Sequence, residues 1–156
     1  MERVAMYRKI LLPLETGGMP EAVARHVIAL AAAHGAAISG LRVIPVISSG
    51  EAFFDKFQVE LGSRGAKLRE EAESEFSRLA RLSQEAGVAF SGEVVFTEKT
   101  EAEAIVAYAA EHGCDLIAMP TRPRGALSRW LMGNVEDKVR RRSPVPVLFV
   151  PVAAGA

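Results

Sequence analysis

Short runs of consecutive apolar residues, rich in branched side chains, recur five times along the chain. They occupy residues 9–14, 38–46, 92–97, 115–119 and 146–152. Strands with one solvated face alternate apolar and polar residues, whereas uninterrupted runs are typical of strands that helices cover on both faces. The pattern therefore predicts five strands of a parallel sheet.

The segments between these runs carry apolar residues at every third or fourth position, which is the period of an amphipathic helix. Four helices are predicted, from Pro20 to Gly35, from about Ala66 to Ala86, from Thr100 to the EHG sequence at 111–113, and from Asn134 to Arg142. Thr100 and Glu103 have the spacing of a capping box, in which both side chains satisfy backbone N–H groups of the first turn. Glycine just beyond the ends of the first three helices is also typical of a helix boundary.

The alternation of strands and helices predicts an α/β fold with a doubly wound, five-stranded parallel sheet. The chain has 156 residues, 49% of them hydrophobic, which is enough for one core and too little for two ordinary domains. We expect a single domain over residues 1–156, with its core at about 8–150. In such a sheet the binding crevice lies at the carboxyl ends of the strands, where the strand order reverses. The loops after the first, second and fourth strands are expected to meet there.

Residues 47–65 fit this scheme least well, because they form a long connection between a strand and a helix. Their apolar residues recur at roughly helical spacing, at Phe53, Phe54, Phe57 and Leu61. This spacing predicts a short amphipathic flap. The aromatic rings either pack on the domain or form a mobile lid or partner surface.

Charge and composition narrow the classes of partner. Lysine plus arginine and aspartate plus glutamate both number 19, so no net field attracts the whole molecule to nucleic acid or membranes. Residues 119–143 hold seven basic and two acidic residues, but few aromatic residues interleave with the arginines, as a nucleic-acid surface would need. The single cysteine and the lack of a leader sequence or a long apolar run favour a cytoplasmic protein without a membrane partner.

No residue cluster indicates catalysis or a metal site. His26 and His34 are eight residues apart without further ligands, so they are interpreted as surface or helix-end histidines. His112 and Cys114 would point in different directions across a turn, so Cys114 is expected to fill a small space beside the fourth strand. The G-x-S-x-G, H-E-x-x-H and Walker motifs are absent. The sequence favours a non-enzymatic protein without a resident cofactor.

Three stretches resemble the universal stress protein family: KILLPLETG at 9–17, AIVAYAAEHGCDLIAM at 104–119 and SRWLMGNVEDKVRRRSPVPVLFV at 128–150. The resemblance extends from about Arg8 to Val150. It implies a role in stress responses and a flavodoxin-like, Rossmann-like sheet of order 3-2-1-4-5, as in adenine-nucleotide α-hydrolase-like folds. It also implies a homodimer through antiparallel pairing of the last strand, at 145–152, while the protein partner stays unknown.

ATP-binding members of this family carry a loop of pattern G-x2-G-x9-G-[S/T], whose backbone N–H groups and hydroxyl hold the phosphates. On this chain the four defined positions fall at Pro120, Pro123, Gly133 and Asn134. Only one of the four matches. The family's aspartate after the first strand falls at Glu15. The family's apolar neighbours of the nucleotide fall at Pro13, Val43, Met119 and Val135.

The two prolines weaken the case for ATP. Proline has no N–H and its φ is fixed near −65°, so it cannot replace glycine as a donor to phosphate. Losing two hydrogen bonds to a charged group would cost roughly 3–6 kcal/mol, or 10² to 10⁴ in affinity. The favoured interpretation is a binding or interaction module in which ATP binding is weakened or lost.

Two alternatives remain open. In the first, the crevice binds ATP or AMP with magnesium through Glu15 and the matching positions, and hydrolyses ATP slowly. In the second, arginines in or beside the loop bind another small anion, together with the helix start at Asn134. These arginines are Arg122, Arg124 and Arg129. In the simpler interpretation, these arginines are solvated or pair with surface carboxylates, and Asn134 is an ordinary N-cap.

Overall fold

The computed structural model describes residues 6–15, 17–46, 61–121 and 135–152. Its elements are β1 (Lys9–Pro13), α1 (Glu21–His34), β2 (Ala37–Pro45), the π-helix η1 (Leu61–Gly65), α3 (Ala66–Glu85), β3 (Phe90–Thr97), α4 (Glu101–Glu111), β4 (Leu116–Thr121), α6 (Val135–Arg142) and β5 (Val147–Pro151). The five predicted strands and four predicted helices are confirmed. Their bounds differ from the predicted ones by two residues at most.

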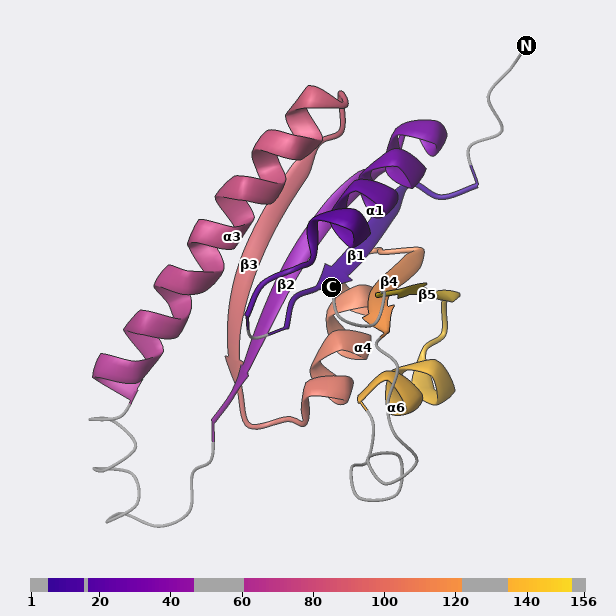
Figure 1. Ribbon diagram of the computed structural model, residues 1–156. Helices are drawn as coiled ribbons and strands as arrows, with labels where there is room; N and C mark the ends of the chain where they lie inside the picture. Colours follow the sequence, from indigo (N-terminus) through magenta and orange to yellow (C-terminus); the bar gives the residue numbers. More distant parts are fainter. Residues whose placement is uncertain (1–5, 16, 47–60, 122–134, 153–156) are drawn as a thin grey trace.

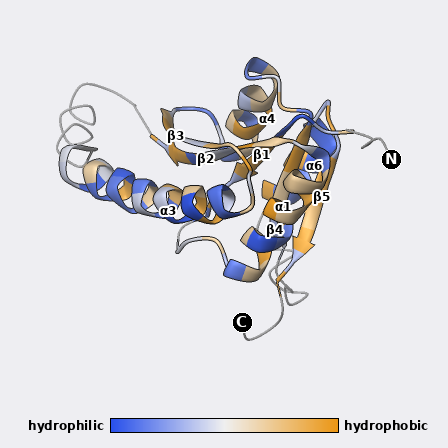
Figure 2. Cartoon of the chain, turned by 90° about the horizontal axis from the view of Figure 1, so that it is seen from above, coloured by the Kyte–Doolittle hydropathy of each residue, from blue (hydrophilic) through white to orange (hydrophobic). Residues whose placement is uncertain are grey.

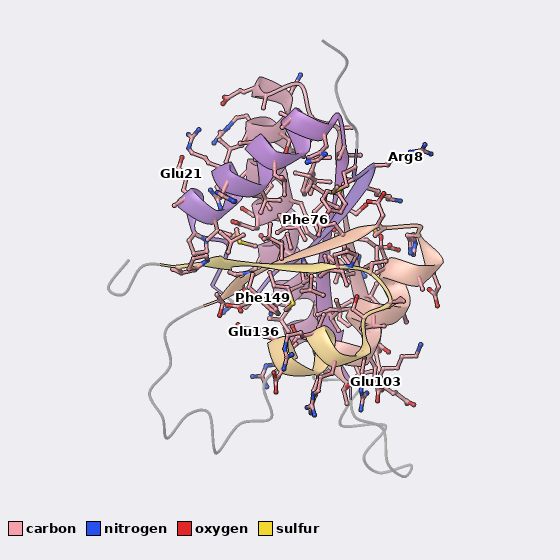
Figure 3. All side chains as sticks on the ribbon, turned by 90° about the vertical axis from the view of Figure 1, so that its right-hand side faces the viewer. Arg8, Glu21, Phe76, Glu103, Glu136 and Phe149 are labelled. Carbon is pink, nitrogen blue, oxygen red and sulfur yellow. The ribbon has the colours of Figure 1, made fainter. Side chains whose placement is uncertain are left out.

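The strands form one parallel sheet of order β3-β2-β1-β4-β5, which confirms the predicted order 3-2-1-4-5. α1 and α3 cover one face, and α4 and α6 cover the other (Figure 1). Figure 3 looks at the sheet from its β5 edge, with Phe76 above β5 and with Glu103 and Glu136 below it. The strand order reverses between β1 and β4, which is where a doubly wound sheet places its binding crevice.

Each face of the sheet buries its own apolar cluster. Beneath α1 and α3 the fully buried side chains include Ile10, Leu12, Val27 and Leu79. Beneath α4 and α6 they include Leu11, Ile105, Ile117 and Val139. Neighbouring residues of a strand point to opposite faces, so a continuous apolar run serves both clusters. Figure 2 shows the charged residues of α3 in blue along the helix and the strands mostly at the hydrophobic end of the scale.

The two edge strands are less covered than the apolar runs predicted. In β3, Ser91, Gly92 and Glu93 are exposed, and in β5 the residues from Val147 to Phe149 are only half-buried. An edge strand has one neighbour and lies at the margin of the helix layers. The prediction of full cover on both faces is therefore wrong for these two strands.

The ring of Phe76 packs α3 against the sheet. Gly40 of β2 and Gly92 of β3 are register partners, and the ring of Phe76 lies against both. A Cβ atom at Gly92 would overlap the ring of Phe76, and one at Gly40 would overlap that of Phe90. The absence of side chains at this pair therefore permits the close approach of helix and sheet.

The helix boundaries follow the predicted signals. The Thr100 hydroxyl accepts a hydrogen bond from the Glu103 N–H (3.2 Å), and the Glu103 carboxylate accepts one from the Thr100 N–H (3.4 Å), which confirms the capping box. Gly35 and Gly87 follow α1 and α3 with φ of 66° and 73°, as predicted for glycines that end helices.

The predicted flap at 47–65 lies mainly outside the described residues, including Phe53, Phe54 and Phe57. Residues 61–65 form η1, which continues directly into α3. In the described ranges, no helix is both long and apolar enough to cross a membrane.

Candidate functional site

A crevice opens between β1 and β4 at the carboxyl end of the sheet. The two strands pair only at Ile10–Leu116 and Leu11–Ile117, although β1 continues to Pro13 and β4 continues to Thr121. A longer ladder would need backbone N–H groups that proline lacks. The sequence therefore separates the two strands at the point where their order reverses.

Backbone hydrogen bonds show which way Pro120 faces. The Ile117 N–H donates to the carbonyl of Pro146 (3.1 Å), and the Thr121 carbonyl accepts from the Val152 N–H (2.8 Å), so both residues face β5. Successive backbone groups of a strand alternate in direction, so the nitrogen of Pro120 faces β1. The missing donor of Pro120 is therefore missing from the crevice side of β4.

Pro120 corrects the predicted end of the fourth strand. The sequence placed Pro120 in the turn after a strand ending at Met119, whereas β4 continues through Pro120 to Thr121 and pairs Pro120 with Val150 of β5. The prediction was wrong because a proline interrupts pairing only on the side that its nitrogen faces. Pairing with β5 carries the strand two residues further.

The crevice encloses a cavity of about 380 Å³. Its lining residues are Pro13, Leu14, Glu15, Arg42, Val43, Pro45, Glu101, Met119, Pro120, Val135 and Glu136. Six of the predicted site residues are among them: Pro13, Glu15, Val43, Met119, Pro120 and Val135. The other five lie outside the described residues: Arg122, Pro123, Arg124, Gly133 and Asn134. That any of these residues binds a ligand stays a prediction.

Sequence reasoning missed three charged residues of the lining, Arg42, Glu101 and Glu136. Arg42 interrupts the apolar run of β2, and each glutamate lies in the first turn of a helix that follows a strand. Acidic residues in a first turn have a sufficient explanation in the helix dipole. Their placement in the first turn of the helix that comes next after a strand was the signal that could have assigned them to the crevice.

The crevice carboxylates lie in a partly dehydrated setting. Burial raises the pKa of Glu101, the negative charge of Glu15 raises it further, and the nearby Arg42 guanidinium opposes this by lowering it. Glu136 is only 9% exposed, and its carboxylate accepts a hydrogen bond from the Thr121 hydroxyl (3.1 Å). The described wall of the crevice is therefore rich in acceptors.

A second cavity, of about 730 Å³, adjoins the crevice on the α3 side. It shares Leu14, Glu15 and Arg42 with the first cavity, so these residues separate the two. Its other walls are the loop at Gly17 and Gly18 and the surface of α3 from Lys67 to Glu75.

A pair on α3 holds the loop that carries Glu15. The Glu75 carboxylate accepts from the Met19 N–H (3.0 Å), while the Arg78 guanidinium donates to the Met19 carbonyl (2.6 Å) and to Glu75 (2.5 Å). Burial alone would raise the pKa of Glu75, but these hydrogen bonds outweigh it and lower the pKa. We call Glu75, Arg78 and the Met19 backbone the loop clamp.

His112 and Cys114, which the sequence suggested as a possible nucleophile and base, do not line the crevice. His112 lies on the surface, stacked on Tyr108 at 3.7 Å between ring centres, whereas Cys114 is 4% exposed and burial raises the pKa of its thiol. That these two residues do not form a nucleophile and base stays a prediction. Within the part of the chain that the structure describes, no group of three His, Cys, Asp or Glu side chains could hold a metal ion.

The three arginines of α6 have carboxylate partners. Arg140 pairs with Asp137 of the same helix (2.8 Å), and Arg142 pairs with Glu103 of α4 (3.3 Å). These pairs account locally for much of the positive charge on α6. This region of the described surface therefore offers little support for a nucleic-acid interface.

The sheet order, the helices on both faces and the crevice at the switch point define a doubly wound α/β protein of the flavodoxin-like type. The model of the universal stress protein family matches residues 6–151. The chain belongs to this family, which confirms the resemblance predicted from its sequence.

The relatives agree over nearly the whole chain. Universal stress protein MJ0531 of Methanocaldococcus jannaschii is 29% identical over 93% of this chain and 82% of its own length. A universal stress protein of Thermus aquaticus is 30% identical over 93% of this chain and 99% of its own. Among solved structures, protein MJ0577 of M. jannaschii is 26% identical with a TM-score of 0.73, and the match covers 96% of this chain and 99% of that one.

Proposed function

We propose that the chain is a binding module of the universal stress protein family in which ATP binding is weakened and no reaction is catalysed. The observation that carries the proposal is the placement of Pro120. Its nitrogen, which has no proton to donate, faces the crevice between β1 and β4. At the matching position of ATP-binding relatives, glycine supplies an N–H.

Two structural relatives support an adenine compound as the class of ligand. One universal stress protein was solved in complex with cAMP, at 17% identity and a TM-score of 0.67. A universal stress protein of Archaeoglobus fulgidus was solved in complex with dAMP, at 17% identity and a TM-score of 0.62. We propose that the crevice of this chain takes the nucleoside part of such a ligand against Pro13, Val43 and Met119, which line its apolar wall.

A glycine at position 120 tests the proposal. A hydrogen bond to a charged group contributes roughly 1.5–3 kcal/mol, so Pro120→Gly is expected to raise ATP affinity about 10- to 100-fold. The triple variant Pro120→Gly, Pro123→Gly, Asn134→Ser is expected to gain more. Calorimetric titration with ATP measures the gain.

Pro144→Gly is the matched control, because Pro144 is exposed and does not line the crevice. It should leave ATP affinity unchanged. Tight ATP binding by the unmodified protein, equal to that of the triple variant, would contradict the proposal. Absorbance at 260 nm from nucleotide that co-purifies with the unmodified protein gives an early sign of that result.

The same titrations decide between the alternatives. AMP or ATP bound tightly with magnesium, followed by release of phosphate, would favour the nucleotide-hydrolysing alternative. Inorganic phosphate that binds as tightly as ATP would favour an anion site formed by Arg122, Arg124 and Arg129.

The homodimer stays a prediction. The single neighbour of β5 and the half-buried side chains from Val147 to Phe149 support it. Cytoplasmic location and an unknown protein partner also stay predictions.

A further inference from the structure

We propose that the crevice selects uncharged nucleosides over phosphorylated ones, with Glu101 and Glu136 as the residues that determine this preference. The inference rests on the proposed function, because it takes an adenine compound as the ligand of the same crevice. It goes further by assigning a discriminating role to two residues. It also predicts the order in which related ligands bind.

The polar chemistry of the described lining matches a nucleoside. Three of its side chains are carboxylates, those of Glu15, Glu101 and Glu136, and one is a guanidinium, that of Arg42. Ionised carboxylates only accept hydrogen bonds. Sugar hydroxyls and an exocyclic amine can donate to them, whereas phosphate oxygens are acceptors that carry negative charge and would be repelled. The wall therefore favours the nucleoside part of a nucleotide and disfavours its phosphates.

Two of the groups that can donate beside these carboxylates already make a hydrogen bond within the chain. The Thr121 hydroxyl donates to Glu136 (3.1 Å), and the Arg42 guanidinium donates to the Leu14 carbonyl (3.3 Å). Pro120 has no N–H to offer. A phosphate at this wall would compete with the three carboxylates for these donors, while a nucleoside hydroxyl could itself donate to a carboxylate oxygen.

The size and the apolar part of the cavity fit one nucleoside. A volume of about 380 Å³ is near the lower end of the usual range of roughly 300–1,000 Å³ for small-molecule sites. Pro13, Val43, Met119 and Val135 supply apolar surface for the faces of a base. Glu136 is close to fully buried, so water screens its charge weakly, and repulsion of a phosphate there is stronger than at the surface.

Calorimetric titration of the full chain with adenosine, AMP, ADP and ATP tests the inference, in low salt and with a chelator that removes divalent cations. Adenosine is expected to bind most tightly, with affinity falling about tenfold at the first phosphate and further with each one added. Glu101→Gln and Glu136→Gln each keep an acceptor oxygen and remove a charge. Each should raise the affinity for AMP relative to adenosine about three- to tenfold.

Glu111→Gln is the control for charge, because Glu111 is exposed at the far end of α4 from Glu101. It should leave the ratio of AMP to adenosine affinity unchanged. Thermal unfolding of each variant verifies that it is folded before titration. A glutamine variant that does not fold is replaced by Glu15→Gln, for which the same change in ratio is expected.

Each result bears on one proposal or the other. Tighter binding of AMP or ATP than of adenosine, no binding of adenosine, or unchanged ratios in the glutamine variants would overturn the nucleoside preference. Gain of ATP binding by the triple loop variant would still support the proposed function in that case. Preference for adenosine without any gain in the loop variant would support the inference and reject the role assigned to the prolines.

Discussion

Two carboxylates on either side of Glu15 and Arg42 have opposite surroundings. Glu75, in the loop clamp, accepts hydrogen bonds from Arg78 and from the Met19 N–H, and these lower its pKa despite burial. Glu101, in the crevice, has a pKa raised by burial, which Arg42 only partly offsets. The first carboxylate holds a loop in place. Burial makes ionisation of the second carboxylate less favourable, which is the setting expected of a group that meets a ligand.

The difference extends to the regions that contain them. On the α3 side, Phe76 fills the space above two glycines, and the loop clamp fixes the loop after β1. In the crevice, the β1–β4 pairing stops early and charged side chains line an open cavity. The contacts on the α3 side stabilise the fold, whereas the early end of the β1–β4 pairing leaves an open cavity at the crevice.

The largest expected effect comes from removing the ring that seats α3. Phe76→Ala should destabilise the protein by about 3–5 kcal/mol, because it leaves a cavity between α3 and the sheet. Phe96→Ala, at a half-buried position of the other edge strand β3, is the matched control and should cost clearly less. Urea denaturation at neutral pH measures both. Equal losses would contradict the role assigned to Phe76 in packing α3 against the sheet.

A smaller effect is expected from breaking the loop clamp. Glu75→Gln should cost about 1–2 kcal/mol at pH 7, since it weakens hydrogen bonds to a charged group. The pKa of Glu75 is lowered from 4.5 in the folded protein, so its contribution is present above that value and is lost as pH falls through the folded pKa. The difference between variant and unmodified protein should therefore shrink in acid.

Glu71→Gln controls for the loss of a charge on the same helix, because Glu71 is exposed. Its effect should be small at every pH. A loss for Glu75→Gln that is the same at pH 7 and pH 3 would show that the clamp acts through packing instead of ionisation.

The fold was predictable because its signals are local and repeated. The apolar run at 9–14 and the Thr100 and Glu103 pair each specify an element from a few neighbouring residues, and the structure confirms both. The end of β4 was not predictable in this way, because pairing with β5, which lies far along the chain, extends the strand through Pro120. Where a proline interrupts a ladder depends on which side its nitrogen faces, and the sequence alone does not give that.

The site was predictable only in part. The family pattern identified Glu15, Val43 and Met119, which line one cavity because each lies within two residues of the carboxyl end of β1, β2 or β4. Glu101 and Glu136 were missed because each satisfies an ordinary rule for the first turn of a helix. When a local rule already explains a residue, its role in a site becomes visible only from the tertiary structure, which shows what the residue faces.

The smallest expected effect, and the sharpest test of the comparison, is a change of opposite sign at Glu101. The pKa of Glu101 is raised above 4.5 in the folded protein. The protonated carboxyl therefore contributes stability that is fully present below pH 4.5 and is lost as pH rises through the folded pKa. Glu101→Gln should therefore stabilise the protein at pH 7. The gain should be under about 1 kcal/mol, because the variant also loses the favourable interaction of the charge with the helix dipole. The gain should vanish in acid, where the unmodified carboxyl is protonated. Denaturant titrations at pH 7 and pH 4 measure the difference, and destabilisation at pH 7 comparable to that of Glu75→Gln would mean that Glu101 is a structural carboxylate as well.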